Sequence, residues 1–299
     1  MNISRVRPCA LVFALLLLSV TTFGQNSPSD SPPQPQPSAT PSLEKKFLAN
    51  IFRDQRAIWT APFHVRRGDG KWLAPLGAAT LLFIATDRHT SGELFEAGNH
   101  SGRLRISRDF SRLGSGYTTG GVAAAFYFVG RAKHDDRARE TGLLAAEALI
   151  DSAIVVTGLK TVSQRQRPTV DHASGEFFDG GSSFPSGHAI SAWALATVID
   201  QEYGRHRPFV RIGVYGLATA VSLSRYTGTN HFLSDVLVGS ALGYGIGRYV
   251  YRQHHDQSLD GSKGTIKKKG ITRSRFFPQI APIYSRRGNA YGATLNWGQ

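Results

Sequence analysis

Residues Ser183–Tyr203 read SFPSGHAISAWALATVIDQEY, and this stretch decides the fold class. From Ser186 onward Ala, Leu, Val and Ile dominate without sustained alternation of apolar and polar residues, which favours a helix over a strand. Six further segments have helical character, the first of them amphipathic: Leu43–Ile58, Lys71–Thr86, Thr118–Ala132, Thr141–Lys160, Pro208–Ser224 and Leu233–Tyr251. We therefore predict an all-α fold, a bundle of about six core helices plus an N-terminal amphipathic helix.

The segments outside the bundle have different compositions. A basic start, the apolar run Cys9–Val20 and small residues after it are typical of a secretory signal peptide, and the run is shorter than the roughly 20 residues that span a bilayer. A spacer rich in Pro, Ser and Gln follows, which we expect to be extended and disordered. Beyond the bundle a basic linker leads to Phe276–Trp297, where two partly alternating runs flank a turn-forming cluster and predict a short β-hairpin. The predicted boundaries are 1–24 for the signal peptide, 25–42 for the spacer, 43–253 for the helical domain, and 254–299 for the linker and hairpin.

The charge balance favours anionic partners. The 299 residues include 35 Lys and Arg against 21 Asp and Glu, a formal net charge of +14. Such an excess suits phosphorylated substrates, acidic lipid surfaces or nucleic acid. The single cysteine, Cys9, lies in the predicted signal peptide. The mature chain would then lack disulfides, Cys-ligated zinc and a Cys nucleophile.

The first motif with chemical content is Lys160-x6-Arg167-Pro168. Seven residues make about two helical turns, so the two cations would lie on one face about 10 Å apart and could converge on one anion. Pro168 disfavours helical conformation at Arg167 and predicts that the helix ends there. The alternative is a solvated basic helix end, where cations also suit the helix dipole.

The second motif, Ser183-Phe184-Pro185-Ser186-Gly187-His188, opens the helix described first. Proline suits the first turn of a helix, and the free N–H groups at a helix start form an anion site. Gly187 allows close approach to the backbone, and His188 would stand beside the bound anion. An ordinary capped helix with a histidine in its first turn is the alternative.

The third motif is Ser224-Arg225-x5-His231-x3-Asp235. His231 and Asp235 are four residues apart, so they can face each other at the start of a helix. A carboxylate beside an imidazole fixes its tautomer and stabilises the cation that forms during nucleophilic attack. Arg225 supplies a further bidentate ligand for phosphate. Chance placement of a His and an Asp at this spacing is the alternative.

The three motifs fall at compatible ends of the predicted helices. The first follows the third core segment, the second precedes the fourth, and the last lies between the fifth and sixth. Consecutive antiparallel helices place all three at the same end of a bundle. The sequence therefore predicts one pocket that combines anion ligands with proton-transfer groups.

Together these motifs resemble the full tripartite motif of the type-2 phosphatidic acid phosphatase and vanadium haloperoxidase superfamily, with no departure at any motif position. The resemblance covers about Leu43 to Tyr251 and implies a metal-independent phosphatase of phosphate monoesters without a cofactor. It implies that His231 is the nucleophile that becomes a phosphohistidine, that Asp235 orients it, and that His188 is the acid and then the base. The implied phosphate ligands are Lys160, Arg167, Ser186, Gly187 and Arg225.

Several alternatives stay open at this level. A vanadium-dependent haloperoxidase would use the same cradle, since vanadate mimics phosphate. A basic nucleic-acid or surface-binding protein would use the lysines at 267–269 and the arginines at 103, 105, 108 and 112, although no stacking aromatics are interleaved with them. Candidate substrates are lipid phosphates, polyprenyl pyrophosphates and small phosphomonoesters, and we expect no nucleic-acid partner.

The predicted location is outside the cytoplasm. A cleaved signal peptide would start the mature chain on the outer side, and three crossings would then place Lys160 inside, whereas integral members of the family place their sites on the outer face. We therefore expect a periplasmic protein, soluble or attached to a membrane surface, with an integral membrane protein as the alternative. Glu147 and Asp151 share a helix face and either pair with a buried cation or face water. The histidines outside the motifs are expected at the surface or in structural roles: His64, His89, His100, His134, His172, His206, His254 and His255.

Overall fold

The structure is a computed structural model that describes residues 43–66, 68–96, 101–170, 174–205, 207–260, 279–285 and 290–296. The chain divides after Asp256 into a helical unit and a C-terminal unit that starts at Gln257. The predicted signal peptide and spacer, and most of the predicted basic linker, lie outside the described residues.

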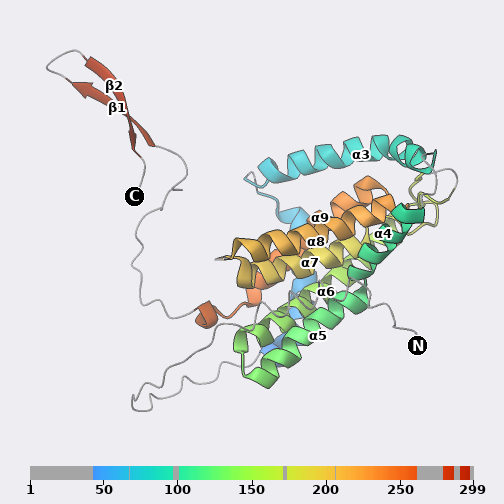
Figure 1. The fold of residues 1–299 in the computed structure, drawn as a ribbon, viewed down its shortest axis with the longest axis horizontal. Helices are drawn as coiled ribbons and strands as arrows, with labels where there is room; N and C mark the ends of the chain where they lie inside the picture. The colour runs from blue at the N-terminus through green and yellow to red at the C-terminus, as the bar shows by residue number, and fades with distance from the viewer. Residues whose placement is uncertain are drawn as a thin grey trace, which may run out of the picture. The chain divides into compact units, whose positions relative to one another are not determined.

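The helical unit confirms the predicted all-α class (Figure 1). Every segment predicted to be helical forms a helix, and several helices extend further than predicted. A π-helical turn, Asp200–Gly204, directly follows α7. A 3-10 turn, Ala61–His64, follows the first helix. The helices are α2 (Leu43–Thr60), α3 (Gly70–Glu96), α4 (Ser101–Leu113), α5 (Gly116–Lys133), α6 (Asp136–Ser163), α7 (Gly187–Ile199), α8 (Pro208–Thr227) and α9 (Leu233–His254).

Helix α4 was not predicted. Its sequence, SGRLRISRDFSRL, holds four arginines, which taken as a sequence indicate a basic binding patch. It packs against α8, where the hydroxyl groups of Ser107 and Thr227 lie 2.7 Å apart. Its apolar and small residues repeat at helical spacing, but the charges between them concealed the pattern.

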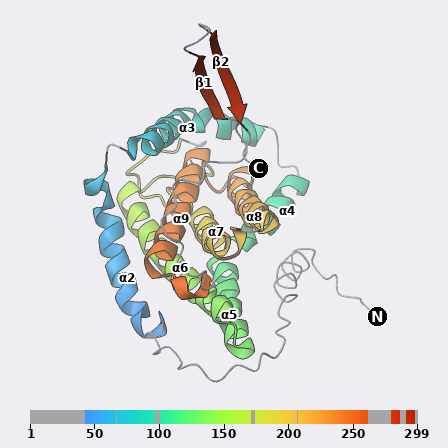
Figure 2. The same cartoon turned by 90° about the vertical axis from the view of Figure 1, so that its left-hand side faces the viewer.

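Helix α7 lies at the centre of the bundle and packs against α5, α6, α8 and α9 (Figure 2). Its side chains are apolar all round, as expected for a helix surrounded by others. The main core cluster contains Ile190 and Val198 of α7, Leu144 and Ala148 of α6, and Val250 of α9, each fully buried.

Glycines on one face of α9 bring this helix unusually close to α7. Gly239, Gly243 and Gly247 recur at four-residue spacing, and a Cβ atom at Gly239 would lie 2.7 Å from the carbonyl oxygen of Ser186. The contacts advance along both helices together, so α7 and α9 run parallel and begin at the same end of the bundle. The glycines therefore seat the start of α7 against the start of α9.

The C-terminal unit contains a 3-10 turn, Gln257–Asp260, and the predicted hairpin. Strands β1 (Gln279–Ser285) and β2 (Ala290–Asn296) pair antiparallel, with Gln279 opposite Asn296 and Ser285 opposite Ala290.

Among the described residues, α6 is the one helix long and apolar enough to cross a membrane. This helix also packs against α5, α7, α9 and α2, and the core helix of a soluble protein meets the same criterion.

Candidate active site

The structure brings the three sequence motifs together at one end of the bundle. Lys160 lies in the last turn of α6 and Arg225 in the last turn of α8. His188 lies in the first turn of α7, and His231 is the residue before Phe232, the N-cap of α9. Because α7 and α9 start where α6 and α8 end, side chains from four helices meet there.

Arg167 does not lie on the same helix face as Lys160, so this prediction is wrong. Helix α6 ends at Ser163, and Gln164 adopts a left-handed conformation (φ 44°) in which its N–H donates to the carbonyl of Lys160 at 3.0 Å. Such a residue is a common helix C-cap. The helix therefore stops before Pro168 can act, and Arg167 reaches the site from the following loop.

His231 and Asp235 face each other across the start of α9. His231 Nδ1 lies 3.5 Å from Asp235 Oδ2, and both side chains are buried. The same Oδ2 accepts hydrogen bonds from the Phe232 N–H at 3.0 Å and from the Ser183 hydroxyl at 2.5 Å. The carboxylate thus caps the helix and also fixes the ring. Since Nδ1 faces the carboxylate, Nε2 is the nitrogen left for a substrate.

The other oxygen of Asp235 pairs with a buried arginine that the sequence analysis missed. Arg165 is 2% exposed, and its Nη1 lies 2.7 Å from Asp235 Oδ1. Its guanidinium lies between the rings of Phe177 and Phe232, with Cζ 4.7 and 4.2 Å from their centroids. Burial alone raises the pKa of Asp235, but the hydrogen bond from His231 and the charge of Arg165 outweigh it and hold that pKa below its usual value. Asp235 therefore stays ionised.

Asp87 of α3 completes this network. Its Oδ2 lies 3.0 Å from Arg165 Nη2 and also accepts a hydrogen bond from the Ser234 hydroxyl. Its Oδ1 accepts the Ser234 N–H at 3.3 Å, so α3 is joined to the start of α9. The signal that could have identified Asp87 is a charged residue directly after an apolar helical run, because such a residue needs a buried partner if the helix continues.

The motif residues that meet at this end of the bundle, called the pocket from here on, concentrate positive charge. Burial, followed by the charges of Arg225, His231, Lys160 and Arg167, lowers the pKa of His188 to about 4. Burial and the charge of Arg167 also lower the pKa of Lys160, and they lower that of Arg225 to about 10. These positive charges thus repel one another. A bound anion would relieve this repulsion.

Several donors around the pocket are held in place or lack partners. Lys160 Nζ donates to the Ser182 carbonyl at 2.8 Å, and Arg225 Nη1 donates to the Ser111 hydroxyl of α4. Arg225 Nε and Ser186 Oγ are buried and have no hydrogen-bond partner among the residues that the structure describes. Buried donors without partners are rare, and an unseen ligand is one accepted explanation.

The start of α7 differs in detail from the prediction. Ser186 is the N-cap, so Pro185 precedes the helix instead of lying in its first turn. The Ser186 N–H donates to the Asp235 carbonyl at 3.0 Å and is not free for an anion. Gly187, the first helical residue, retains an N–H in the position that favours anions.

Two groups of side chains in the described part of the chain could hold a metal ion, and neither includes a motif residue. They are Asp54, Glu147 and His254, and Glu140, Glu202 and His255.

Comparison with known proteins gives consistent matches. Residues 141–259 match the family model described as PAP2 superfamily. The decaprenylphosphoryl-5-phosphoribose phosphatase of Mycobacterium tuberculosis is 35% identical over 136 residues, which cover 44% of this chain and 68% of that protein. The lipid A 1-phosphatase of Porphyromonas gingivalis is 39% identical over 70 residues, 23% of this chain and only 16% of that protein.

Two solved structures are also similar. The structure of Aquifex aeolicus LpxE has 22% identity and a TM-score of 0.44, over 56% of this chain and 94% of that one. The first transmembrane PAP2 type phosphatidylglycerolphosphate phosphatase from Bacillus subtilis has 19% identity and a TM-score of 0.47, over 71% and 97%.

Proposed function

Because the chain belongs to the PAP2 superfamily, we propose that it is a phosphatase that cleaves phosphate monoesters through a phosphohistidine on His231. The observation that carries the proposal is the group of three cations, Lys160, Arg167 and Arg225, at the end of the bundle that also holds His188 and His231. Burial first, and these charges second, lower the pKa of His188. Such a pocket favours a ligand with two or more negative charges. The sequence relatives named above are themselves phosphatases, which supports the same reaction class.

In the first step, Nε2 of His231 attacks phosphorus in line. An N–P bond forms while the P–O bond to the leaving group breaks. The imidazole becomes positively charged, and Asp235, held ionised by Arg165, stabilises that charge through Nδ1. Arg165 is a positioning residue in this scheme, since it acts through Asp235.

The cradle stabilises the charge that develops on phosphorus. Lys160, Arg167 and Arg225 hold the non-bridging oxygens, and the hydroxyl of Ser186 and the N–H of Gly187 complete it. Positive charge that is already fixed in position stabilises the developing negative charge without reorganisation during the reaction. We propose on this ground that these cations supply the stabilisation without a metal ion.

His188 carries the proton. In the empty pocket its pKa of about 4 leaves it neutral near pH 7, because it is buried among cations. A bound phosphate dianion offsets those cations and raises the pKa, so the substrate itself promotes protonation of its acid. His188 then gives this proton to the leaving oxygen. It next takes a proton from the water that attacks phosphorus, which breaks the N–P bond and releases phosphate.

A largely apolar groove on the helical unit supports a substrate with a hydrocarbon chain. A cavity of about 580 Å³ lies between α2, α5 and α6, and small or apolar residues such as Gly120, Ala123 and Ala146 line most of it. Ser191, which is one helical turn beyond His188 on α7, also lines the groove. We therefore propose lipid or polyprenyl phosphates ahead of small phosphomonoesters.

The test compares phosphate release from these three substrate classes by the purified chain, His231→Asn and His89→Asn. His89 is exposed and outside the pocket, so its variant is the matched control. We expect His231→Asn to fold and to lose at least about 10³-fold in turnover, and to lose the acid-labile radiolabelled phosphoenzyme. Near-normal turnover of His231→Asn would refute the mechanism. Halide oxidation with added vanadate and peroxide, without phosphate release, would favour the haloperoxidase alternative.

The proposal also covers where in the cell the protein works. We propose that residues 1–24 direct export and that the helical domain works in the periplasm, in solution or at a membrane surface, with an integral membrane protein as the alternative. Fractionation of the expressed chain into periplasm and membrane distinguishes these.

A further inference from the structure

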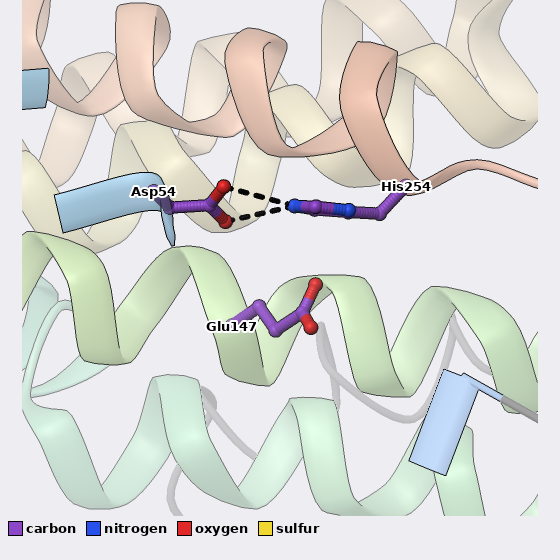
Figure 3. A group of neighbouring side chains, drawn as sticks. All are labelled: Asp54, Glu147 and His254. Carbon is purple, nitrogen blue, oxygen red and sulfur yellow. Dashed lines mark hydrogen bonds and ion pairs between the residues drawn. The ribbon is translucent and has the colours of Figure 1, made fainter. Parts of the chain in front are cut away.

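A second group of buried polar side chains lies far from the motif residues (Figure 3). Asp54 comes from α2, Glu147 and Asp151 from α6, and His254 is the last residue of α9. The three acidic residues are at most 1% exposed, and the His254 side chain is 6% exposed. Since α9 has 22 residues, its end lies about 30 Å along the axis from the start that carries His231. This group therefore has no part in the proposed phosphatase site.

The distances within the group match a site for one small cation. His254 Nε2 lies 3.0 and 2.9 Å from the two oxygens of Asp54. One donor atom from each of Asp54, Glu147 and His254 lies within 4.8 Å of the others. In Figure 3 the carboxylate of Glu147 is turned toward the Asp54–His254 pair.

Two buried oxygens in the group have no partner. Asn50 donates to Glu147 Oε1 at 2.8 Å, and Gln55 donates to Asp151 Oδ1 at 2.8 Å. The second oxygens, Glu147 Oε2 and Asp151 Oδ2, are buried and accept no hydrogen bond from any residue that the structure describes. Amide groups that hold one oxygen while the other stays free are the arrangement found behind metal-ligating carboxylates.

The charges in the group do not balance. Three carboxylates face one imidazole, so even a protonated His254 leaves an excess of negative charge when the acids are ionised. Arg53, the residue before Asp54, has an exposed side chain. Buried charges are paired, coordinate metals or are neutralised by a shifted pKa, because an unpaired buried charge is costly.

A second group of buried acids, Glu140 of α6 and Glu202 of the π-helical turn, shows how this fold balances such acids with ion pairs. Glu140 and Glu202 lie 3.2 and 3.3 Å from the same His255 Nδ1. Arg137 Nε lies 3.2 Å from Glu202, and the Asp256 N–H donates to Glu140 at 2.5 Å. Two carboxylates here pair with two cationic groups. This group therefore serves as the charge-balanced comparison for the group around Asp54.

We propose that Asp54, Glu147 and His254 bind one divalent transition-metal ion, Zn²⁺ or Mn²⁺, with Asp151 beside them as a further oxygen donor. Carboxylate oxygens with one imidazole nitrogen suit these ions, and the set lacks the thiolates of softer sites. Metal–ligand bonds of about 2.0–2.2 Å place ligand atoms roughly 3–4 Å apart, so small side-chain rotations complete the site. The ion joins α2 and α9 to α6 and stabilises the end of the bundle opposite the phosphatase pocket.

The experiment measures binding and stability, not activity. The full chain is stripped with a chelator and titrated calorimetrically with Zn²⁺, Mn²⁺ and, as a comparison, Mg²⁺. We expect one Zn²⁺ or Mn²⁺ per chain and much weaker Mg²⁺ binding. At 100 times the dissociation constant, the ion should raise the unfolding midpoint by about 5–10 °C.

Matched variants assign the ligands. Glu147→Gln keeps the side-chain size and should weaken binding by at least about 100-fold, while Glu140→Gln makes the same change in the balanced group and should leave it unaltered. If Glu147→Gln does not fold, metal binding is measured on His254→Gln instead, where the same loss is expected. Absence of Zn²⁺ and Mn²⁺ binding to the wild-type chain, or binding that survives the folded ligand variants, overturns the proposal. Neither result bears on the phosphatase mechanism.

Discussion

Replacing Arg165 with Met tests whether the buried ion-pair network holds the candidate nucleophile in place. Methionine fills much of the space between Phe177 and Phe232 but cannot balance charge. Asp87 and Asp235, which lie 3.0 and 2.7 Å from the guanidinium, would be left as buried carboxylates without their cation. The change therefore removes one partner from two buried pairs at once.

The magnitude follows from the burial of all three side chains, each 2% exposed or less. Removing one partner of a buried ion pair costs about 3–5 kcal/mol of unfolding free energy. For a domain of this size each 1 kcal/mol lowers the unfolding midpoint by about 2–4 °C. We expect the midpoint of Arg165→Met to fall by about 6–20 °C, with phosphatase turnover falling as well because Asp235 is no longer held.

Thermal unfolding followed by circular dichroism measures this effect, with Arg167→Met as the matched control. Arg167 faces the pocket and repels Lys160 and Arg225, so its loss should leave the midpoint unchanged or slightly higher while kcat/KM falls by about 10²–10³-fold. If Arg165→Met does not fold, Arg165→Lys retains one charge and should show a smaller decrease. A midpoint of Arg165→Met within about 2 °C of the wild type would refute the reasoning.

Three further predictions address the proposed mechanism and the packing. Burial lowers the pKa of His231 below 6.5, and Asp235 partly offsets this effect by raising it. Asp235→Asn should therefore move the acidic limb of the kcat/KM profile to still lower pH. A shift of that limb to higher pH would contradict this. Gly243→Ala should overpack against the α7 backbone and cost about 1–3 kcal/mol in urea unfolding, whereas Gly245→Ala on the open face should add about 0.5–1 kcal/mol. His188→Asn should lower turnover of alkyl phosphates by about 10²–10⁴-fold. Turnover of nitrophenyl phosphate should fall less, because its leaving group needs no proton. Equal losses of turnover on both substrates would count against a general acid.

The helical class could be predicted from the sequence because apolar runs without alternation report on local backbone preference. The failures have equally local causes. Helix α4 was hidden by its four arginines, and the end of α6 was misplaced because a left-handed Gln164 is not foreseeable from composition. Glutamine rarely adopts that conformation, so only the packed structure specifies it.

The candidate site divides in the same way. The three motifs, taken together with the family they resemble, predicted His188, His231 and Asp235 as site residues, since each motif depends only on neighbours along the chain. The partners that hold them could not be found in this way, because Arg165 and Asp87 are 78 positions apart and meet only when α3 packs beside α9.

By itself, the sequence determined the all-α class, the basic charge and the three motifs, because these depend on residue identity and on neighbours along the chain. The tertiary structure decided which charges are buried and what they face. It turned Arg165 into a bridge between two acids and brought Asp54 and Glu147 to His254 from three different helices. Burial and pairing depend on which helix faces meet, and no local pattern encodes that.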